Sequence, residues 1–378
     1  MRRIHCSLCL LVSCLPLFVA CSRNSVQGTT SHTSTIWELK PSLKYDALCL
    51  LNALSGDPFY LKYYQSEYDY FHPLFLPDEQ VAFNQLKRVI KDQRGGIVSA
   101  TLTLYYSAVD DETLPEMIRT AHDSSTMKAA LQKTPYWIPE AWRNYEEARP
   151  ALEIALRALD RVGFAAYWEQ VAKPKIEKRI AELSPELPKF DVIPVIEKYV
   201  GLPLPSHTIN VYLLAYSEPH GIRVTGLSFL THISYPFTIV LRNAIHESMH
   251  PPYRADDPTV RHAIELLGRD ALILDKVAHH DPAFGYNSAQ GLIEEDSVEA
   301  LEQIVSEEFG VGRNPRIYWY SQDGGMHLLA PAIYASYKQA LSQHPEPYSQ
   351  WFAHAVEDGQ LRGPNLQRAI RKFFFWFR

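Results

Sequence analysis

The chain has 378 residues, enough to bury a full hydrophobic core and to hold as many as two domains. Hydrophobic residues make up 46% of it and charged residues 21%, which excludes a disordered or fibrous protein. The 37 Lys and Arg against 43 Asp and Glu give a formal net charge of −6. Because nucleic-acid binding usually needs a basic patch, we expect no nucleic-acid partner.

The start of the chain has the order of a secretory signal: two arginines, an apolar run from Cys9 to Ala20, and then Cys21. The run is too short for a spanning helix. Its end, LFVAC, resembles the lipobox of bacterial lipoproteins, and this resemblance implies cleavage before Cys21 and lipidation of that cysteine. The alternative is a plain secretory signal followed by a free cysteine.

The signal also predicts a location. Residues 1–20 would form a lipoprotein signal peptide, and the mature chain would be lipid-anchored to a membrane of the cell envelope, facing the periplasm or the exterior. Ser22 is not the aspartate of an inner-membrane retention signal, so we expect the outer membrane in a Gram-negative host. Lipid on Cys21 leaves Cys49 without a partner, and the apolar run DALCLLNAL around Cys49 predicts a buried, inert thiol.

Two regions lie between the signal and residue 201, where predicted strands begin to mix with helices. Residues 21–36 are rich in Ser and Thr without an apolar period, which is typical of a flexible tether. Residues 37–200 are predicted to be helical nearly throughout. Within them, 78–93 opens on an acidic first turn, and 149–183 predicts two helices that meet near Gly163.

Residues 201–378 mix strands and helices. The segments TINVYLLAYS and TGLSFLTHISYP are rich in β-branched and aromatic residues and predict two strands, which could pair as a hairpin. The C-terminal NLQRAIRKFFFWFR predicts an amphipathic helix docked on the body, with contact to a membrane surface as the alternative. We expect a mainly α (α+β) fold with a small β-sheet. Helical spacing predicts further helices over 237–250, 258–279, 289–309 and 326–342.

The segment RNAIHESMHPPY (242–253) is a candidate metal site. On a helix, His246 and His250 lie on one face and could bind one ion. Glu247 could reach a water at that ion and accept its proton, which is the HExxH arrangement. Pro251 should end the helix and place His250 off helical geometry.

A catalytic zinc needs a third protein ligand, and the chain offers two candidates. Asp256 follows His250 at the distance seen in metzincin-like enzymes, but Tyr253 stands where that arrangement needs a glycine turn. The segment GLIEEDSVEALEQIV (291–305) is a predicted helix on which Glu295 and Glu299 are four residues apart and point to one side. One carboxylate could bind metal while the other accepts the N–H of a ligating histidine.

With these residues the chain resembles the gluzincin metallopeptidases, the thermolysin-like clan. The resemblance implies His246, His250 and Glu295 as zinc ligands. It implies Glu247 as general base and Glu299 as the outer hydrogen-bond partner of a ligand. It further implies a zincin-like catalytic half over residues 201–378, on which the helical region 37–200 would pack.

Other interpretations remain open at this point. The run containing Glu294, Glu295 and Glu299 could be a solvated acidic helix face. His327 and Tyr334 could stabilise an oxyanion, or could be an ordinary helix histidine and a buried tyrosine.

The function expected from these observations is that of a zinc-dependent hydrolase. It would be a membrane-anchored metallopeptidase with one zinc per chain, Glu247 as base, and a peptide or protein as substrate. The alternative is a lipid-anchored binding or scaffold protein whose HExxH is degenerate and not catalytic.

Overall fold

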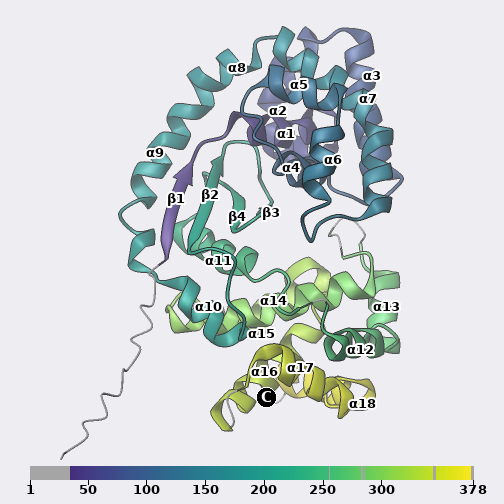
Figure 1. Cartoon of the computed structure of the whole chain (residues 1–378), viewed down its shortest axis with the longest axis vertical. Coiled ribbons are helices and arrows are strands. Elements are labelled where there is room, and N and C mark those ends of the chain that lie inside the picture. The colour runs from purple at the N-terminus through teal and green to yellow at the C-terminus, as the bar shows by residue number, and fades with distance from the viewer. Residues whose placement is uncertain (1–34, 255, 282–283, 285, 344–345, 376–378) are drawn as a thin grey trace, which may run out of the picture. The chain divides into compact units, whose positions relative to one another are not determined.

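The computed structural model describes residues 35–254, 256–281, 284, 286–343 and 346–375 (Figure 1). The described residues all belong to one compact unit. The structure is 67% helix and 6% strand with one small mixed sheet, which confirms the mainly α prediction. The predicted signal peptide, the lipidation site Cys21 and nearly all of the tether lie outside the described residues.

The sheet has four strands in the order β1-β2-β4-β3. β2 pairs in parallel with both β1 and β4, and β3 pairs antiparallel with β4. β3 therefore lies at one edge of the sheet. The strands are β1 (Ile36–Lys40), β2 (Thr208–Leu214), β3 (Ile222–Val224) and β4 (Ser228–His232).

Two expectations about strands are wrong. The segments now seen as β2 and β4 do not form a hairpin, because the short β3 between them reverses the chain so that β2 and β4 run parallel. The region that starts at Trp37 opens with a strand, β1, and not with a helix. Trp37 pairs with Ile209. Because this partner is far along the chain, the local sequence around Trp37 does not indicate a strand.

The helical region largely follows the prediction. Gly163, with a φ of 76°, separates α7 from α8 as expected for the join near that residue. α3 continues through a π-helical turn to Asp92, which matches the helix predicted over 78–93. Cys49 is fully buried on α1. The helices are α1 (Leu43–Leu54), α2 (Pro58–Phe71), α3 (Pro77–Lys87), α4 (Val98–Tyr106), α5 (Leu114–His122), α6 (Ser125–Leu131), α7 (Pro139–Arg161), α8 (Phe164–Tyr167), α9 (Lys173–Leu183) and α10 (Val192–Val200).

The second half adds eight described helices. The segment predicted as one helix over 258–279 is two, because Asp270 follows the end of α12 and caps a new helix by accepting the N–H of Leu272. Helices α14 and α16 match their predictions closely. The helices are α11 (Phe237–Ser248), α12 (Pro258–Leu267), α13 (Ala271–His279), α14 (Ala289–Glu308), α15 (Pro315–Ser321), α16 (Leu329–Gln343), α17 (Tyr348–Glu357) and α18 (Gly363–Phe375).

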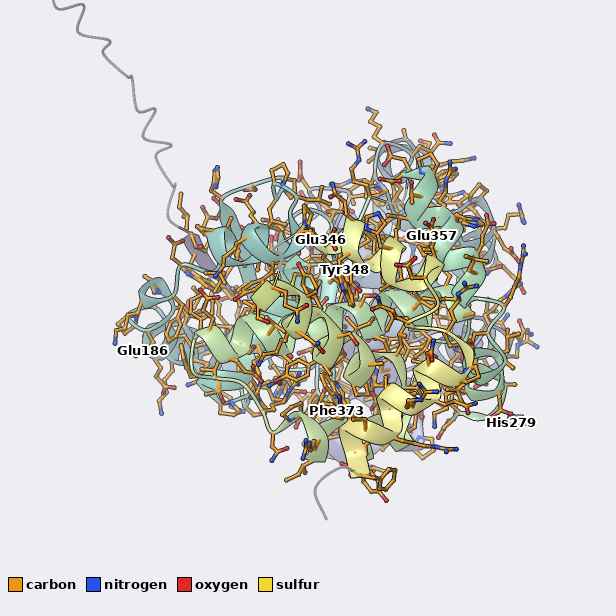
Figure 2. The ribbon with its side chains drawn as sticks, turned by 90° about the horizontal axis from the view of Figure 1, so that it is seen from below. Glu186, His279, Glu346, Tyr348, Glu357 and Phe373 are labelled. Atoms are coloured by element: carbon orange, nitrogen blue, oxygen red, sulfur yellow. The ribbon has the colours of Figure 1, made fainter. Side chains whose placement is uncertain are left out.

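The last helices pack on α14 and its neighbours (Figure 2). α16 lies against α14, α17 against α12, and α18 against α16. Leu366 and Phe373, on the apolar side of α18, are buried, as expected for a helix docked on the body. Among the described residues, no helix combines the length and the apolar character that crossing a bilayer requires.

The sheet joins the two halves of the chain around the motif helix. α11 packs on β4 and α14, while α4, from the helical region, packs on β3. Asp46 on α1 adds a buried polar tie, because its carboxylate accepts the N–H groups of Ala215 and Tyr216 at the end of β2. The helical region therefore reaches the side of the sheet that carries the candidate site.

Candidate metal centre

The motif lies where α11 meets α14. Val240, Leu241, Ala244 and Ile245 are buried on α11 and hold it against its neighbours. α14 is buried along most of its length, and Glu295 is only 8% exposed. The sequence allowed this acidic run to be a solvated helix face, and that interpretation is wrong for Glu295.

The end of α11 is as the prolines predict. The helix stops at Ser248, so His250 lies beyond its last turn and directly before Pro251. His250 nevertheless turns back toward His246: the two Nε2 atoms are 3.1 Å apart. The two histidines therefore face one point although only His246 is on the helix.

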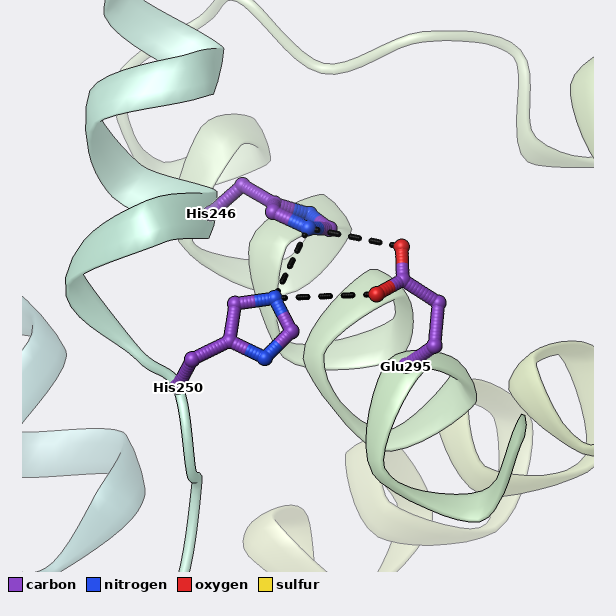
Figure 3. A group of neighbouring side chains, drawn as sticks. All are labelled: His246, His250 and Glu295. Carbon is purple, nitrogen blue, oxygen red and sulfur yellow. Dashed lines mark hydrogen bonds and ion pairs between the residues drawn. The ribbon is translucent and has the colours of Figure 1, made fainter. Parts of the chain in front are cut away.

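Glu295 completes the group (Figure 3). Its Oε1 lies 3.4 Å from Nε2 of His246, and its Oε2 lies 3.6 Å from Nε2 of His250. Ligand atoms of all three residues lie within 4.8 Å of one another. In Figure 3 the two imidazoles and the carboxylate converge on a common space between α11 and α14.

These distances fit a small tetrahedral cation. Two ligand atoms that are each about 2.1 Å from a tetrahedral zinc lie about 3.4 Å apart. Each of the three separations, 3.1, 3.4 and 3.6 Å, is near that value, with Glu295 facing His246 through Oε1 and His250 through Oε2. Two imidazole nitrogens and one carboxylate oxygen are also the donor set of many catalytic zinc sites, which keep the fourth position open.

The electrostatics of the group favour a cation. Burial raises the pKa of Glu295 to about 7, because an ionised carboxylate is poorly solvated there. Burial lowers the pKa of His246, and the neighbouring His250 lowers it further. A dication between these groups would favour the ionised carboxylate and the neutral imidazole that metal binding needs.

The outer hydrogen bonds differ from the prediction. Glu294 lies 3.1 Å from Nδ1 of His250 and can accept its N–H, which directs the Nε2 lone pair to the centre. Glu299, the predicted partner, lies 3.9 Å from Nδ1 of His246, beyond hydrogen-bonding distance. Its carboxylate accepts the indole N–H of Trp319 at 3.0 Å instead. Of the two carboxylates, Glu294 is therefore the one that lies at hydrogen-bonding distance from a histidine of the group, whereas the resemblance implied Glu299.

Replacing Glu294 by Ala should weaken zinc binding by about 10- to 100-fold, because His250 would lose the acceptor that fixes its tautomer and orientation. Competition with a fluorescent zinc chelator measures the change. Glu265→Ala, an exposed carboxylate on α12, is the matched control and should bind zinc as the native chain does. Equal affinities for the native chain and Glu294→Ala would remove this orienting role.

Glu247 lies beside His246, His250 and Glu295 but does not belong to this group. It is half-buried and lines the cavities next to the centre. Burial raises its pKa, while His250 and Arg223 oppose the shift. A Cβ placed on Gly221 would lie 3.0 Å from Nδ2 of Asn243, whereas Oε1 of Glu247 would be at an ordinary contact distance of 3.6 Å. A carboxylate with a raised pKa beside a metal site is suited to accept a proton.

Two adjoining cavities, of about 550 and 270 Å³, open on the centre. Both are lined by His246, Glu247 and Glu295. Their walls also include side chains of the helical region, which therefore forms part of the site. These wall residues are Phe59, Ile97, Ala100 and Leu104.

Two residues that line the cavities could not be identified as site residues from the sequence. Tyr286 precedes α14 and donates its hydroxyl to Oε1 of Glu295 at 3.0 Å. His220 precedes β3, and its Nε2 lies 2.8 Å from the hydroxyl of Tyr60. Burial lowers the pKa of His220 to about 4, so its imidazole is neutral at pH 7. Both residues lie in irregular chain, where periodicity gives no information.

His327 lies near these residues, but both of its ring nitrogens contact carboxylates outside the candidate metal group. Its Nδ1 is 2.8 Å from Asp296 and its Nε2 is 3.2 Å from Asp323. Burial acts to lower its pKa, but these hydrogen bonds raise it well above the ordinary histidine value. Since both ring nitrogens face carboxylates, the structure leaves no N–H of His327 for an oxyanion. The residue instead ties α14 to the chain before α16.

Tyr334 and Asp256 are not brought to the centre. The hydroxyl of Tyr334 donates to Glu307 at 2.6 Å, and Glu307 lies twelve residues along α14 from Glu295, or about 18 Å. Asp256 is 72% exposed and pairs with Arg254. The structure therefore supports Glu295 over Asp256 as the third ligand and gives Tyr334 no part in the site.

Comparison with known proteins adds no relative. No protein-family model, curated protein or solved structure matches the chain.

Proposed function

We propose that the protein is a zinc-dependent hydrolase, and specifically a metallopeptidase. The observation that carries this proposal is the convergence of His246, His250 and Glu295 at tetrahedral spacing, with Glu247 beside them at an open cavity. A helix with HExxH, a second helix with the third ligand and a sheet edge at the cavity are the parts of a zincin-like catalytic half. We infer that residues 201–378 form such a half.

The chain's own residues have distinct tasks in this proposal. Zinc, when bound, supplies a Lewis acid and lowers the pKa of water. Glu247 accepts the proton of the attacking water and passes it to the leaving amine. Tyr286 holds Glu295 in place through its hydroxyl. The neutral imidazole of His220 lines the cavity and takes over the role of oxyanion donor that the sequence assigned to His327 and Tyr334.

The residues that line the cavities beside the candidate metal site favour a peptide as the substrate. Ile222 and Arg223 of β3 line the smaller cavity, and β3 is an edge strand. An edge strand can pair with an extended peptide through backbone hydrogen bonds. The wall formed by α4, which packs on β3, is apolar and suits a side chain. Digestion of a mixed peptide library by the purified chain, read by mass spectrometry, tests this function. A zinc-loaded chain that cleaves nothing in the library would contradict it.

Pro251 and Pro252, directly after His250, are the best argument in the sequence for the alternative of a degenerate site. They end α11, but the Nε2 atoms of His246 and His250 remain 3.1 Å apart. The prolines therefore give no reason to reject metal binding.

We also propose that the chain is a lipoprotein of the cell envelope, anchored through Cys21. Cys21→Ser should leave the protein unprocessed or release it from the membrane fraction, because the acylated residue is gone. Cell fractionation with mass spectrometry of the N-terminal peptide measures this, and Cys49→Ser is the matched control. A Cys21→Ser chain that stays with membranes, together with a native chain free of acyl groups, would contradict the proposal.

A further inference from the structure

The guanidinium of Arg223 lacks partners for two of its nitrogens. Nε and Nη1 are buried, and neither has a hydrogen-bond acceptor among the described residues. A buried cationic donor without an acceptor is costly, since it has lost water and gained nothing in return. Such a group is therefore a candidate for binding an anion that the chain does not itself supply.

The strand directs this side chain toward the centre. On β3, Ile222 and Val224 are buried on one face, so Arg223 points to the other. Gly221, directly before β3, is close to Glu247, since a Cβ built on it would lie 3.6 Å from Oε1 of that residue. Arg223 lines the smaller cavity together with His246, Glu247 and His250.

The surroundings hold Arg223 without neutralising it. Its Cζ lies 5.6 Å from the ring centroid of Tyr136, which is a cation–π contact and provides no anion. No carboxylate of the described residues lies within ion-pair distance of Arg223, whereas Arg313 in the larger cavity pairs with Glu299 and Glu302. Glu247 interacts electrostatically with Arg223 from beyond ion-pair distance, so Nε and Nη1 keep their capacity to donate to an incoming anion.

We propose that Arg223 binds a carboxylate of the substrate beside the scissile bond. The planar guanidinium presents paired donors that match a carboxylate, and in a peptide the carboxylates are the available anions. Ile97, Ala100 and Leu104 form the apolar wall of the same cavity and would hold an adjacent apolar side chain. This inference rests on the proposed peptidase function and narrows its substrates to peptides with an acidic group at this position.

The carboxylate has two sources, the C-terminus of the peptide or an Asp or Glu side chain. Two pairs of N-acetylated peptides separate them. One pair differs only in a free or amidated C-terminus, and the other has an amidated C-terminus and differs only in Glu or Gln. The native chain should cleave the acidic member of one pair with a kcat/KM about 10- to 100-fold higher. The pair that shows the preference identifies the source.

Arg223→Met should reduce this preference to about one, through loss on the acidic peptide alone. Arg242→Gln is the matched control, because Arg242 lines the larger cavity but already donates to the carbonyl of Val311. It should keep the preference. A native chain without preference in either pair would overturn the proposal. So would an Arg223→Met chain that keeps the preference or loses activity equally on both members.

Binding to the metal-free full chain separates this proposal from the peptidase function. In calorimetry after removal of metal, the acidic peptides should bind the native chain more tightly than Arg223→Met, and the neutral ones equally. A chain that shows this pattern yet cleaves no peptide would refute the function and keep the carboxylate site. A chain that cleaves peptides but binds acidic and neutral members alike would refute the site and keep the function.

Discussion

Replacing Glu247 by Gln is expected to lower peptide hydrolysis by about 100- to 10,000-fold, the usual loss when a general base is removed. Glutamine has nearly the same shape as glutamate but cannot accept a proton. Glu247 is beside the ligand group and not part of it, so zinc content and thermal stability should stay near native. Assays of kcat/KM, zinc content and thermal unfolding on one preparation measure all three.

His246→Ala is the matched comparison for this change. It removes a ligand, so metal and activity should be lost together. The contrast between His246→Ala and Glu247→Gln distinguishes a ligand from a base. If Glu247→Gln is as active as the native chain on a cleaved peptide, the assigned mechanism is wrong even where the metal site stands.

Glu295→Ala should abolish tight zinc binding, a larger effect than the roughly 10- to 100-fold loss that follows removal of an outer partner. The carboxylate supplies one of three protein ligands, and two imidazoles alone hold zinc weakly. Zinc affinity, measured by chelator competition on the native and variant chains, gives the size of the loss.

Asp256→Ala is the control for this prediction, because Asp256 is exposed and paired with Arg254. It should bind zinc as the native chain does. Loss of zinc in Asp256→Ala with retention in Glu295→Ala would transfer the third-ligand role and remove the gluzincin-like assignment.

The three candidate ligands could be named from local patterns in the sequence, and the structure brings them together. The helical period places Glu295 on a long predicted helix. His250 lies beyond the end of α11, and it meets His246 because the chain turns back there. The outer partner could not be predicted in this way. Whether Glu294 or Glu299 meets a histidine depends on how α11 crosses α14 and on His250 lying beyond the end of its helix.

Long-range contacts account for the other differences. β1 pairs with β2, whose residues are about 170 positions further along the chain, and no local pattern announces such a partner. His327 and Tyr334 sit on or near the predicted helix α16, but their partners, Asp296 and Glu307, are on α14. The position of Arg223 in the cavity could not be predicted for the same reason, since its neighbours there come from three separate parts of the chain.

The zinc content of the native chain, purified without chelators and dialysed against metal-free buffer, tests the central claim most directly. Inductively coupled plasma mass spectrometry gives the metal-to-protein ratio without any choice of substrate. We predict close to one zinc per chain, removed by a strong chelator and restored by added zinc. A native chain that holds no zinc above background, and takes up none when zinc is supplied, would contradict the metal centre built by His246, His250 and Glu295.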